Sequence, residues 1–222
     1  MARNVPCRAR GPRAKHPLYR HGPGAICIAY AAQKICEQEL SNALVLPRGA
    51  ASLPQLFAAG ELNAITINFP TPQPKAKYAK KRLVHVDHLM LYRSLFAADA
   101  TVTLRTDSKP LRDYALGQFA AAGYDTLWVS DDVRRDHPEH PETEYECRTR
   151  EMGAVVYGIC ATPGAQPTDE QLTAGRMQEQ SLACYLPDNL DELTYVPLGM
   201  EEAVENFRNR ARKGKKRLPQ ER

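Results

Sequence analysis

A loop rich in proline and lysine has the composition needed to hold a phosphate-bearing ligand. Residues 68–75 read Asn-Phe-Pro-Thr-Pro-Gln-Pro-Lys, and the three alternate prolines restrict the backbone to an extended form. A loop that is already stiff loses little conformational entropy when a ligand binds. The cations in and after this loop fall within eight residues and are Lys75, Lys77, Lys80, Lys81 and Arg82. Clustered cations attract phosphates, so the sequence predicts a polyanion-binding loop, with a functionless proline-rich surface loop as the alternative.

The elements expected to position this loop alternate between short β-rich runs and helical patterns. Strands are predicted at residues 25–30, 43–46, 63–68, 100–105, 126–130 and 153–160. Helices are predicted at residues 31–40, from Ser52 onward, through Leu89 to Phe96, and at 111–119. Such alternation indicates an α/β fold with a doubly wound sheet, in which ligands bind at the carboxyl ends of the strands. We therefore expect functional residues in the loops that follow these strands.

The composition changes along the chain and suggests three segments. Residues 1–24 form a basic, irregular N-terminal segment, and residues 25–160 form the α/β domain. Residues 161–222 form a helical C-terminal extension that ends in a basic tail. Within this extension, helices are expected at residues 168–184 and 200–213, with irregular structure at 188–197.

The composition also excludes several classes of protein. Hydrophobic residues make up 43% of the 222 residues and charged residues 25%, which is typical of soluble globular domains. No apolar run approaches the roughly 18 residues that a membrane span needs, so we expect no membrane partner. The six cysteines form no CxxC pair, so we expect no metal site and a reduced, cytoplasmic setting. The net charge is only +4, but the clustering of cations suggests a polyanionic partner, with a solvated surface and a frayed tail as the open alternative.

Three segments in one order carry a resemblance to a known family. The first is INFPTPQPKAKYAKKRL at residues 67–83, the second is Leu104–Asp107, and the third is Pro141–Glu146. Together they resemble the tRNA (guanine-N7)-methyltransferase family, and the similarity covers about residues 25–160. The resemblance implies a Rossmann-like sheet of the class I methyltransferase type. It also implies S-adenosylmethionine as the cofactor and methyl donor, and tRNA as the partner.

The resemblance implies roles for individual residues as well. A methyl group would pass from a sulfonium to N7 of a guanine in the tRNA variable loop, a reaction that depends on positioning more than on base catalysis. The family's nucleobase and tRNA contacts fall on Lys75, Asp107, Thr143, Glu144, Tyr145 and Glu146. We expect Asp107 and Glu146 to accept hydrogen bonds from N–H groups of the guanine, with helix capping as the alternative role of Asp107. A basic path for tRNA would consist of Lys77, Lys80, Lys81 and Arg82.

The positions that hold the cofactor in this family lack their acidic residues here. The residue expected to bind the ribose hydroxyls falls on Ala29, and the carboxylate on the adenine side falls on Ala50. The catalytic Asp of the family's proline loop is Thr71, and its Trp is Gln73. Gly22-Pro23-Gly24, the nearest equivalent of the glycine turn, follows no β-rich run. The domain is therefore expected to be N-terminally incomplete.

Two explanations of these departures stay open, namely a missing first strand and a diverged homologue, and both can apply. They lead to two hypotheses about function. The first is an enzyme that transfers a methyl group from S-adenosylmethionine to tRNA, with impaired cofactor binding. The second is a catalytically inactive RNA-binding homologue on the same scaffold.

Overall fold

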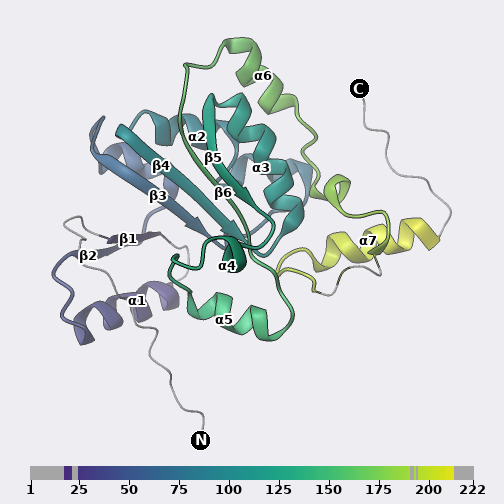
Figure 1. Cartoon of the computed structure of the whole chain (residues 1–222), viewed down its shortest axis with the longest axis horizontal. Helices are drawn as coiled ribbons and strands as arrows, with labels where there is room; N and C mark the ends of the chain where they lie inside the picture. The colour runs from purple at the N-terminus through teal and green to yellow at the C-terminus, as the bar shows by residue number, and fades with distance from the viewer. Residues whose placement is uncertain (1–17, 22–24, 191–192, 194, 213–222) are drawn as a thin grey trace, which may run out of the picture. The chain divides into compact units, whose positions relative to one another are not determined.

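The chain divides into two compact units, Met1–Ala58 and Ala59–Arg222. The computed structural model describes residues 18–21, 25–190, 193 and 195–212 (Figure 1). Most of the basic N-terminal segment and the tail from Lys213 onward lie outside these residues. The division at Ala58 differs from the segment boundaries expected after residues 24 and 160, and the residues from 161 onward belong to the second unit.

The first unit contains two short parallel strands and a helix. Strand β1 (Leu18–His21) pairs with β2 (Ala43–Leu46), and α1 (Ala25–Glu37) lies between them in sequence. The strand predicted at residues 25–30 is wrong, because these residues form the first turns of α1. A continuous apolar run has no periodicity that separates a strand from a helix, and here good helix formers follow it. The strand predicted at residues 43–46 is confirmed, but its partner is β1.

The helix predicted to start at Ser52 is a short 3₁₀ helix, η1 (Ala50–Gln55). Its N-cap residue is Gly49, and the Ser52 hydroxyl donates a hydrogen bond to the Gly49 carbonyl at 2.8 Å. The hydroxyl is therefore a donor within the first turn and does not cap the helix.

A four-stranded mixed sheet forms the centre of the second unit. Its strands are β3 (Leu62–Asn68), β4 (Phe96–Thr106), β5 (Tyr124–Ser130) and β6 (Tyr157–Pro163), in the order β3-β4-β6-β5. β3 and β4 run parallel, whereas β6 is antiparallel to both β4 and β5. The expected α/β class is confirmed, and each of the last four predicted strands overlaps an observed one. β6 begins later than predicted, because residues 153 and 154 still close the preceding helix through hydrogen bonds to Arg150 and Thr149.

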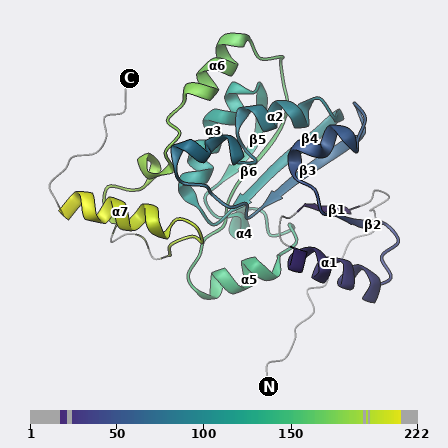
Figure 2. The ribbon, with the colours of Figure 1, turned by 180° about the vertical axis from the view of Figure 1, so that it is seen from behind.

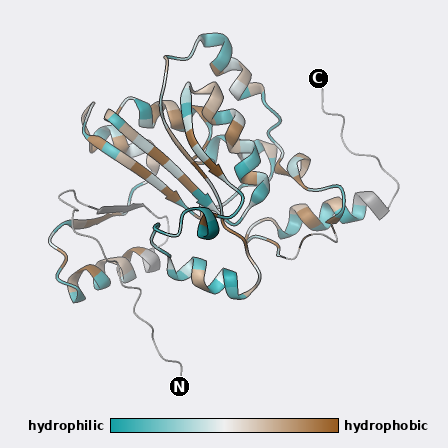
Figure 3. Ribbon diagram, viewed as in Figure 1, coloured by the Kyte–Doolittle hydropathy of each residue, from teal (hydrophilic) through white to brown (hydrophobic). Residues whose placement is uncertain are grey.

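Helices follow the strands of this unit: α2 (Val86–Arg93), α3 (Lys109–Ala121), α4 (Val133–Asp136) and α5 (Glu144–Glu151). Figures 1 and 2 show α2 and α3 on the same face of the sheet. The core there includes Leu104, Leu111, Tyr114, Phe119 and Ile159, all essentially unexposed. Figure 3 shows many hydrophobic residues in the strands, whereas α5 is mostly hydrophilic. Phe96, expected in the helix, instead opens β4, because α2 ends at Arg93.

The C-terminal extension contains α6 (Asp169–Met177), the 3₁₀ helix η3 (Leu182–Tyr185) and α7 (Glu201–Arg212). The single helix predicted at 168–184 is thus two helices, whereas the helix predicted at 200–213 is confirmed as α7. Gln178 bridges the extension to α3, because its amide donates to the Tyr114 carbonyl at 3.0 Å and accepts from Gln118 at 2.7 Å. No helix in the described part of the chain combines the length and apolar character of a membrane span.

Candidate functional site

The proline loop after β3 is held in place by one buried arginine. Arg82 is only 1% exposed, and its guanidinium lies 4.4 Å from the centre of the Tyr114 ring. It donates hydrogen bonds to the carbonyls of Pro72 and Gln73 in the loop, and to Gln180 of the extension at 2.6 Å. The prediction that Arg82 lies on an exposed basic path is therefore wrong. Its role is to fix the loop to the rest of the unit.

The backbone of this loop contains two left-handed residues that are not glycine. Phe69 has a φ of 47° and Gln73 a φ of 53°. Side chains with a Cβ adopt such angles rarely, and the surrounding contacts must hold them. The hydrogen bonds from Arg82 to the neighbouring carbonyls supply part of this restraint. The prolines alone predicted a wholly extended loop, and the two left-handed residues depart from that expectation.

The 3₁₀ helix η2 (Ala76–Lys81) presents the remaining cations to solvent. Lys77, Lys80 and Lys81 are exposed, and Tyr78 is half-buried between two of them. The ammonium groups of Lys77 and Lys81 lie 5.0 and 4.8 Å from the centre of the Tyr78 ring. Exposed lysines can bind phosphates, and an aromatic ring beside them can stack on a base. We refer to these four residues as the basic aromatic surface.

Lys75 lies at the end of the proline loop and forms an ion pair with the extension. Its ammonium is 2.8 Å from the Glu202 carboxylate, and both side chains are largely exposed. The hydrogen bond with Glu202 raises the pKa of Lys75 above its ordinary value. The extension contacts the loop at a second point, where the backbone N–H of Leu182 donates to the Pro74 carbonyl at 3.0 Å.

Asp107 lies directly after β4, and its carboxylate accepts two tyrosine hydrogen bonds. The hydroxyls of Tyr145 and Tyr195 each donate to Oδ2 of Asp107 at 2.9 Å. Burial and the nearby Asp107 charge raise the pKa of Tyr145 to about 12, and burial raises that of Tyr195 further. Both hydroxyls are therefore protonated donors at neutral pH. The helix α3 is capped by Ser108, whose hydroxyl accepts from Leu111 N–H, so the capping alternative for Asp107 is wrong.

Thr143 and Glu146 have structural roles that differ from the expected contact with a base. Thr143 caps α5, and the two residues form a capping box with reciprocal hydrogen bonds. The Glu146 side chain has no exposed surface and pairs with Arg105 and, at 2.6 Å, with Arg134. A carboxylate enclosed in this way cannot reach a nucleobase in this conformation. Glu146 instead anchors α5 and thereby the neighbouring Tyr145, while Glu144 is exposed.

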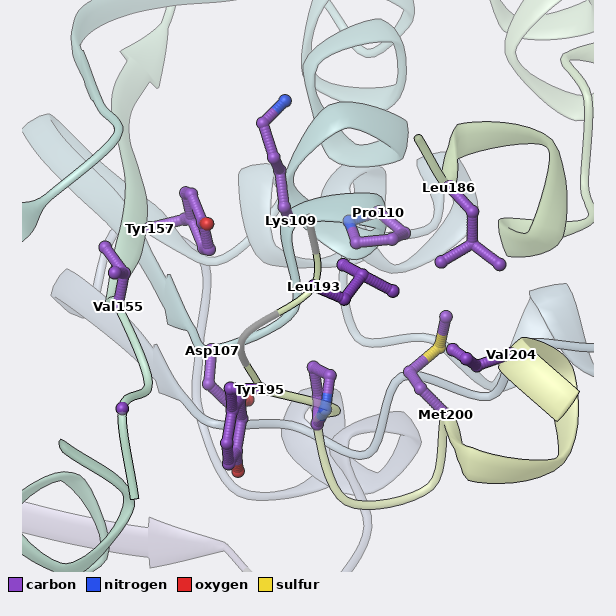
Figure 4. A pocket seen from close by; sticks show the side chains of 12 residues that line it. Asp107, Lys109, Pro110, Val155, Tyr157, Leu186, Leu193, Tyr195, Met200 and Val204 are labelled. Carbon is purple, nitrogen blue, oxygen red and sulfur yellow. The ribbon is translucent and has the colours of Figure 1, made fainter. Parts of the chain in front are cut away.

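A small cavity lies beside Asp107 and has a volume of about 90 Å³. Six of its twelve lining residues come from the extension. Figure 4 shows Asp107 and Tyr195 on one side of it, with Met200 and Val204 across from them. Lys75 and Asp107 therefore share a neighbour, since residues 195–202 of the extension contact both. Glu146 does not line this cavity and pairs with Arg105 and Arg134 instead.

The positions expected to hold S-adenosylmethionine offer no suitable side chains. Ala29 lies within α1 and Ala50 within η1, where the family resemblance expects carboxylates after strands. Neither methyl group can accept a hydrogen bond from a ribose hydroxyl. Thr71 is exposed and carries a hydroxyl in place of the expected carboxylate. The segment Gly22-Pro23-Gly24 lies outside the described residues. The side chains at these positions do not fit the cofactor.

Sequence reasoning missed Tyr195, Arg105 and Arg134. Tyr195 lies in a segment without periodicity, so no pattern linked it to Asp107. Arg105 was visible in the second motif, and its place inside a buried strand is the signal that it needs a charged partner. Arg134 gave no such signal, because it stands among exposed charges near residues 131–136.

Comparisons with known proteins agree with the sequence motifs. A family described as "Putative methyltransferase" matches residues 25–159. The tRNA (guanine-N(7)-)-methyltransferase of Streptococcus equi subsp. zooepidemicus strain MGCS10565 is 31% identical over 136 residues, which cover 61% of this chain and 64% of that protein. The protein of the same name from Exiguobacterium sibiricum is 34% identical over 131 residues, covering 59% and 62%. The chain thus spans just under two thirds of the length of these curated relatives. Among solved structures, an antibiotic-related methyltransferase matches with a TM-score of 0.47 and 16% identity, covering 66% of this chain and 75% of that one.

Proposed function

The chain belongs to the putative methyltransferase family, and from this premise we propose that it is a tRNA (guanine-N7)-methyltransferase that recognises its target base through Asp107. The relatives named above carry that activity in their names, which supports the substrate class. The observation that carries the proposal is the place of Asp107. Its carboxylate lies at the end of β4, next to the cavity, and is held by two hydroxyl donors.

The chemistry of guanine agrees with such a site. N7 carries a lone pair, so the enzyme must position the base and need not remove a proton from it. The opposite edge of guanine presents N1–H and N2–H donors, which an ionised carboxylate can accept. Because a stacked base is out of reach, the guanine would leave its stack, with the basic aromatic surface holding the neighbouring phosphates.

The positions expected to hold the methyl donor lack carboxylate hydrogen-bond acceptors. S-adenosylmethionine is the donor that the family suggests, yet Ala29 and Ala50 supply no acceptor for it. Each lost hydrogen bond to a charged group costs on the order of 1.5–3 kcal/mol. Two such losses would move a micromolar affinity toward the millimolar range. This observation favours a second candidate function, in which the protein binds RNA without transferring a methyl group.

Two measurements separate the candidates. Isothermal titration with S-adenosylmethionine gives the cofactor affinity, and incubation with tRNA followed by nucleoside analysis reports 7-methylguanine. Cofactor binding together with methylated tRNA supports the enzyme. Salt-sensitive tRNA binding without cofactor binding supports the RNA-binding homologue, and no tRNA binding at all contradicts both. The cytoplasmic location expected from the cysteine content stays a prediction.

A further inference from the structure

Tyr195 contacts Asp107 from a part of the chain that the family match does not include. The match ends at residue 159, whereas Tyr195 belongs to the C-terminal extension. Its hydroxyl and that of Tyr145 both donate to the same carboxylate oxygen, Oδ2. Among the described residues, no hydrogen bond reaches the other oxygen, Oδ1. The two tyrosines therefore occupy one oxygen of Asp107 and leave the second available beside the cavity.

Both tyrosines are partly buried against neighbouring side chains. The Tyr145 ring lies 5.0 Å from the Phe69 ring, and the capping box fixes the start of its helix. Tyr195 is half-buried, and Met200, five residues further along the chain, is fully buried. A carboxylate otherwise turns easily about its last side-chain bond. Two fixed donors on one oxygen restrict this rotation and thereby set the direction of the free oxygen.

We propose that Tyr195 is a positioning residue of the guanine site, which orients the Asp107 carboxylate so that Oδ1 accepts an N–H group of the base. This assignment rests on the proposed function. It makes the extension a part of the base-recognition site. The carboxylate then discriminates between purines, because guanine offers a donor at N1, whereas adenine places an acceptor there and would meet the oxygen with repulsion.

The test is a Tyr195→Phe variant of the full chain, which removes the hydroxyl and keeps the ring. Dissociation constants are measured for a tRNA with guanine in its variable loop and for the same tRNA with adenine at that position. The native protein is expected to bind the guanine-bearing tRNA more tightly than the adenine-bearing one. In the variant, the ratio of the two dissociation constants should be roughly tenfold smaller. Its affinity for the adenine-bearing tRNA should change little, because the lysines are intact. Tyr185→Phe is the matched control, since the Tyr185 hydroxyl bonds only Gln178 and Glu179 among the described residues.

A Tyr145→Phe variant tests the same idea from the other donor. It should show a similar loss, and the double variant should lose less than the sum of the two, because both hydroxyls act on one carboxylate. Full retention of guanine preference in both single variants, while Asp107→Asn abolishes it, would overturn the role of Tyr195 and leave the proposed function intact. Tight tRNA binding by the native protein without any guanine preference would overturn both.

A separate group of side chains follows α4 and points to a metal site. His137, Glu139 and His140 each offer one ligand atom, and these atoms lie within 4.8 Å of one another. Nδ1 of His137 is 3.3 Å from Glu139 Oε1, and Nε2 of His140 is 3.9 Å from the same oxygen. The turn is fixed, since the Arg134 guanidinium donates to the His140 carbonyl at 2.8 Å. Trp128 stacks on the His137 ring, with centroids 4.1 Å apart.

We infer that this group binds a late first-row divalent ion such as Zn²⁺, Ni²⁺ or Cu²⁺. Two imidazoles and one carboxylate match the ligand preference of these ions, and three protein ligands leave coordination positions for water. This inference differs from the expectation of no metal, which relied on cysteine spacing. It does not depend on the proposed function.

Trp128 gives a direct assay, because it is the only tryptophan of the chain. Titration of the untagged protein with Cu²⁺ should quench its fluorescence and saturate at one ion per chain. His140→Gln and Glu139→Gln should each weaken this binding at least about tenfold, whereas His88→Gln should not. Quenching that does not saturate, or that is unchanged in both variants, would overturn the site.

Discussion

The buried ion pairs of Glu146 predict a large loss of stability when its charge is removed. In Glu146→Gln the side chain keeps its shape and can still complete a capping box, so the helix cap is preserved. The charge is lost, however, and Arg105 and Arg134 then face each other without a counter-ion, at 2% and 14% exposure. Breaking a buried pair in this way costs about 3–5 kcal/mol. For a chain of this size, the melting temperature should fall by roughly 6–20 °C.

Thermal unfolding followed by circular dichroism measures this change. Glu151→Gln is the matched control, because Glu151 is exposed at the end of the same helix and its substitution should shift the melting temperature by no more than about 2 °C. The difference between the variants should persist in 0.5 M salt, since buried pairs are screened little. Equal melting temperatures for the two variants, or a difference that vanishes in salt, would refute the buried pairing.

Four further changes have separate expected results. Ser108→Ala should lower the free energy of unfolding by about 1 kcal/mol in a denaturant titration, because Ser108 caps α3, whereas Asp107→Asn should mainly weaken guanine preference. Charge reversal of Lys80 and Lys81 should weaken tRNA binding and reduce the slope of log affinity against log salt by about two, and an unchanged slope would exclude these lysines from the RNA path. Glu202→Gln should release Lys75 and raise tRNA affinity about two- to fivefold, a modest effect because the pair is exposed. A weaker affinity would contradict the idea that Glu202 competes with tRNA for Lys75. Burial lowers the pKa of His85 below 6.5, so the unfolded chain takes up a proton first as the pH falls. Stability should therefore be full above about pH 6.5 and decline below it, and His85→Asn should flatten this decline in melting curves recorded from pH 7.5 to 5.

The fold of the second unit was largely predictable, whereas that of the first was not. The strands β3 to β6 are short β-rich runs separated by clear helical patterns, and such patterns report burial on a sheet directly. The run at residues 25–30 is apolar throughout, so its composition fits a strand or a helix equally well. Neither pattern nor propensity could reveal that β2 pairs with β1 in a separate small sheet.

The candidate site was predicted in part. Asp107 and Lys75 were expected at one edge of the sheet, because both follow strands whose carboxyl ends lie there. Their contacts with Tyr195 and Glu202 of the extension were not predicted. Glu146 and Arg82 were misjudged, since a motif gives the residue type but not its exposure. Both charges are buried against partners far away in sequence. Tyr195 could not be predicted, because its contact with Asp107 depends on the path of an irregular segment.

The hydrogen bonds of Arg82 indicate what removal of the C-terminal extension would do to the proline loop. The guanidinium donates to carbonyls of the proline loop and also to the carbonyl of Gln180, which lies 98 residues after Arg82 in the sequence. A protein shortened at residue 160 would lose one of these acceptors and expose the ring of Tyr114 beneath the cation. The loop would then be free to relax from its two left-handed residues. Residues 178–182 of the extension thus belong to the same packed unit as the proline loop, and removing them is expected to loosen a loop that lies far upstream in the sequence.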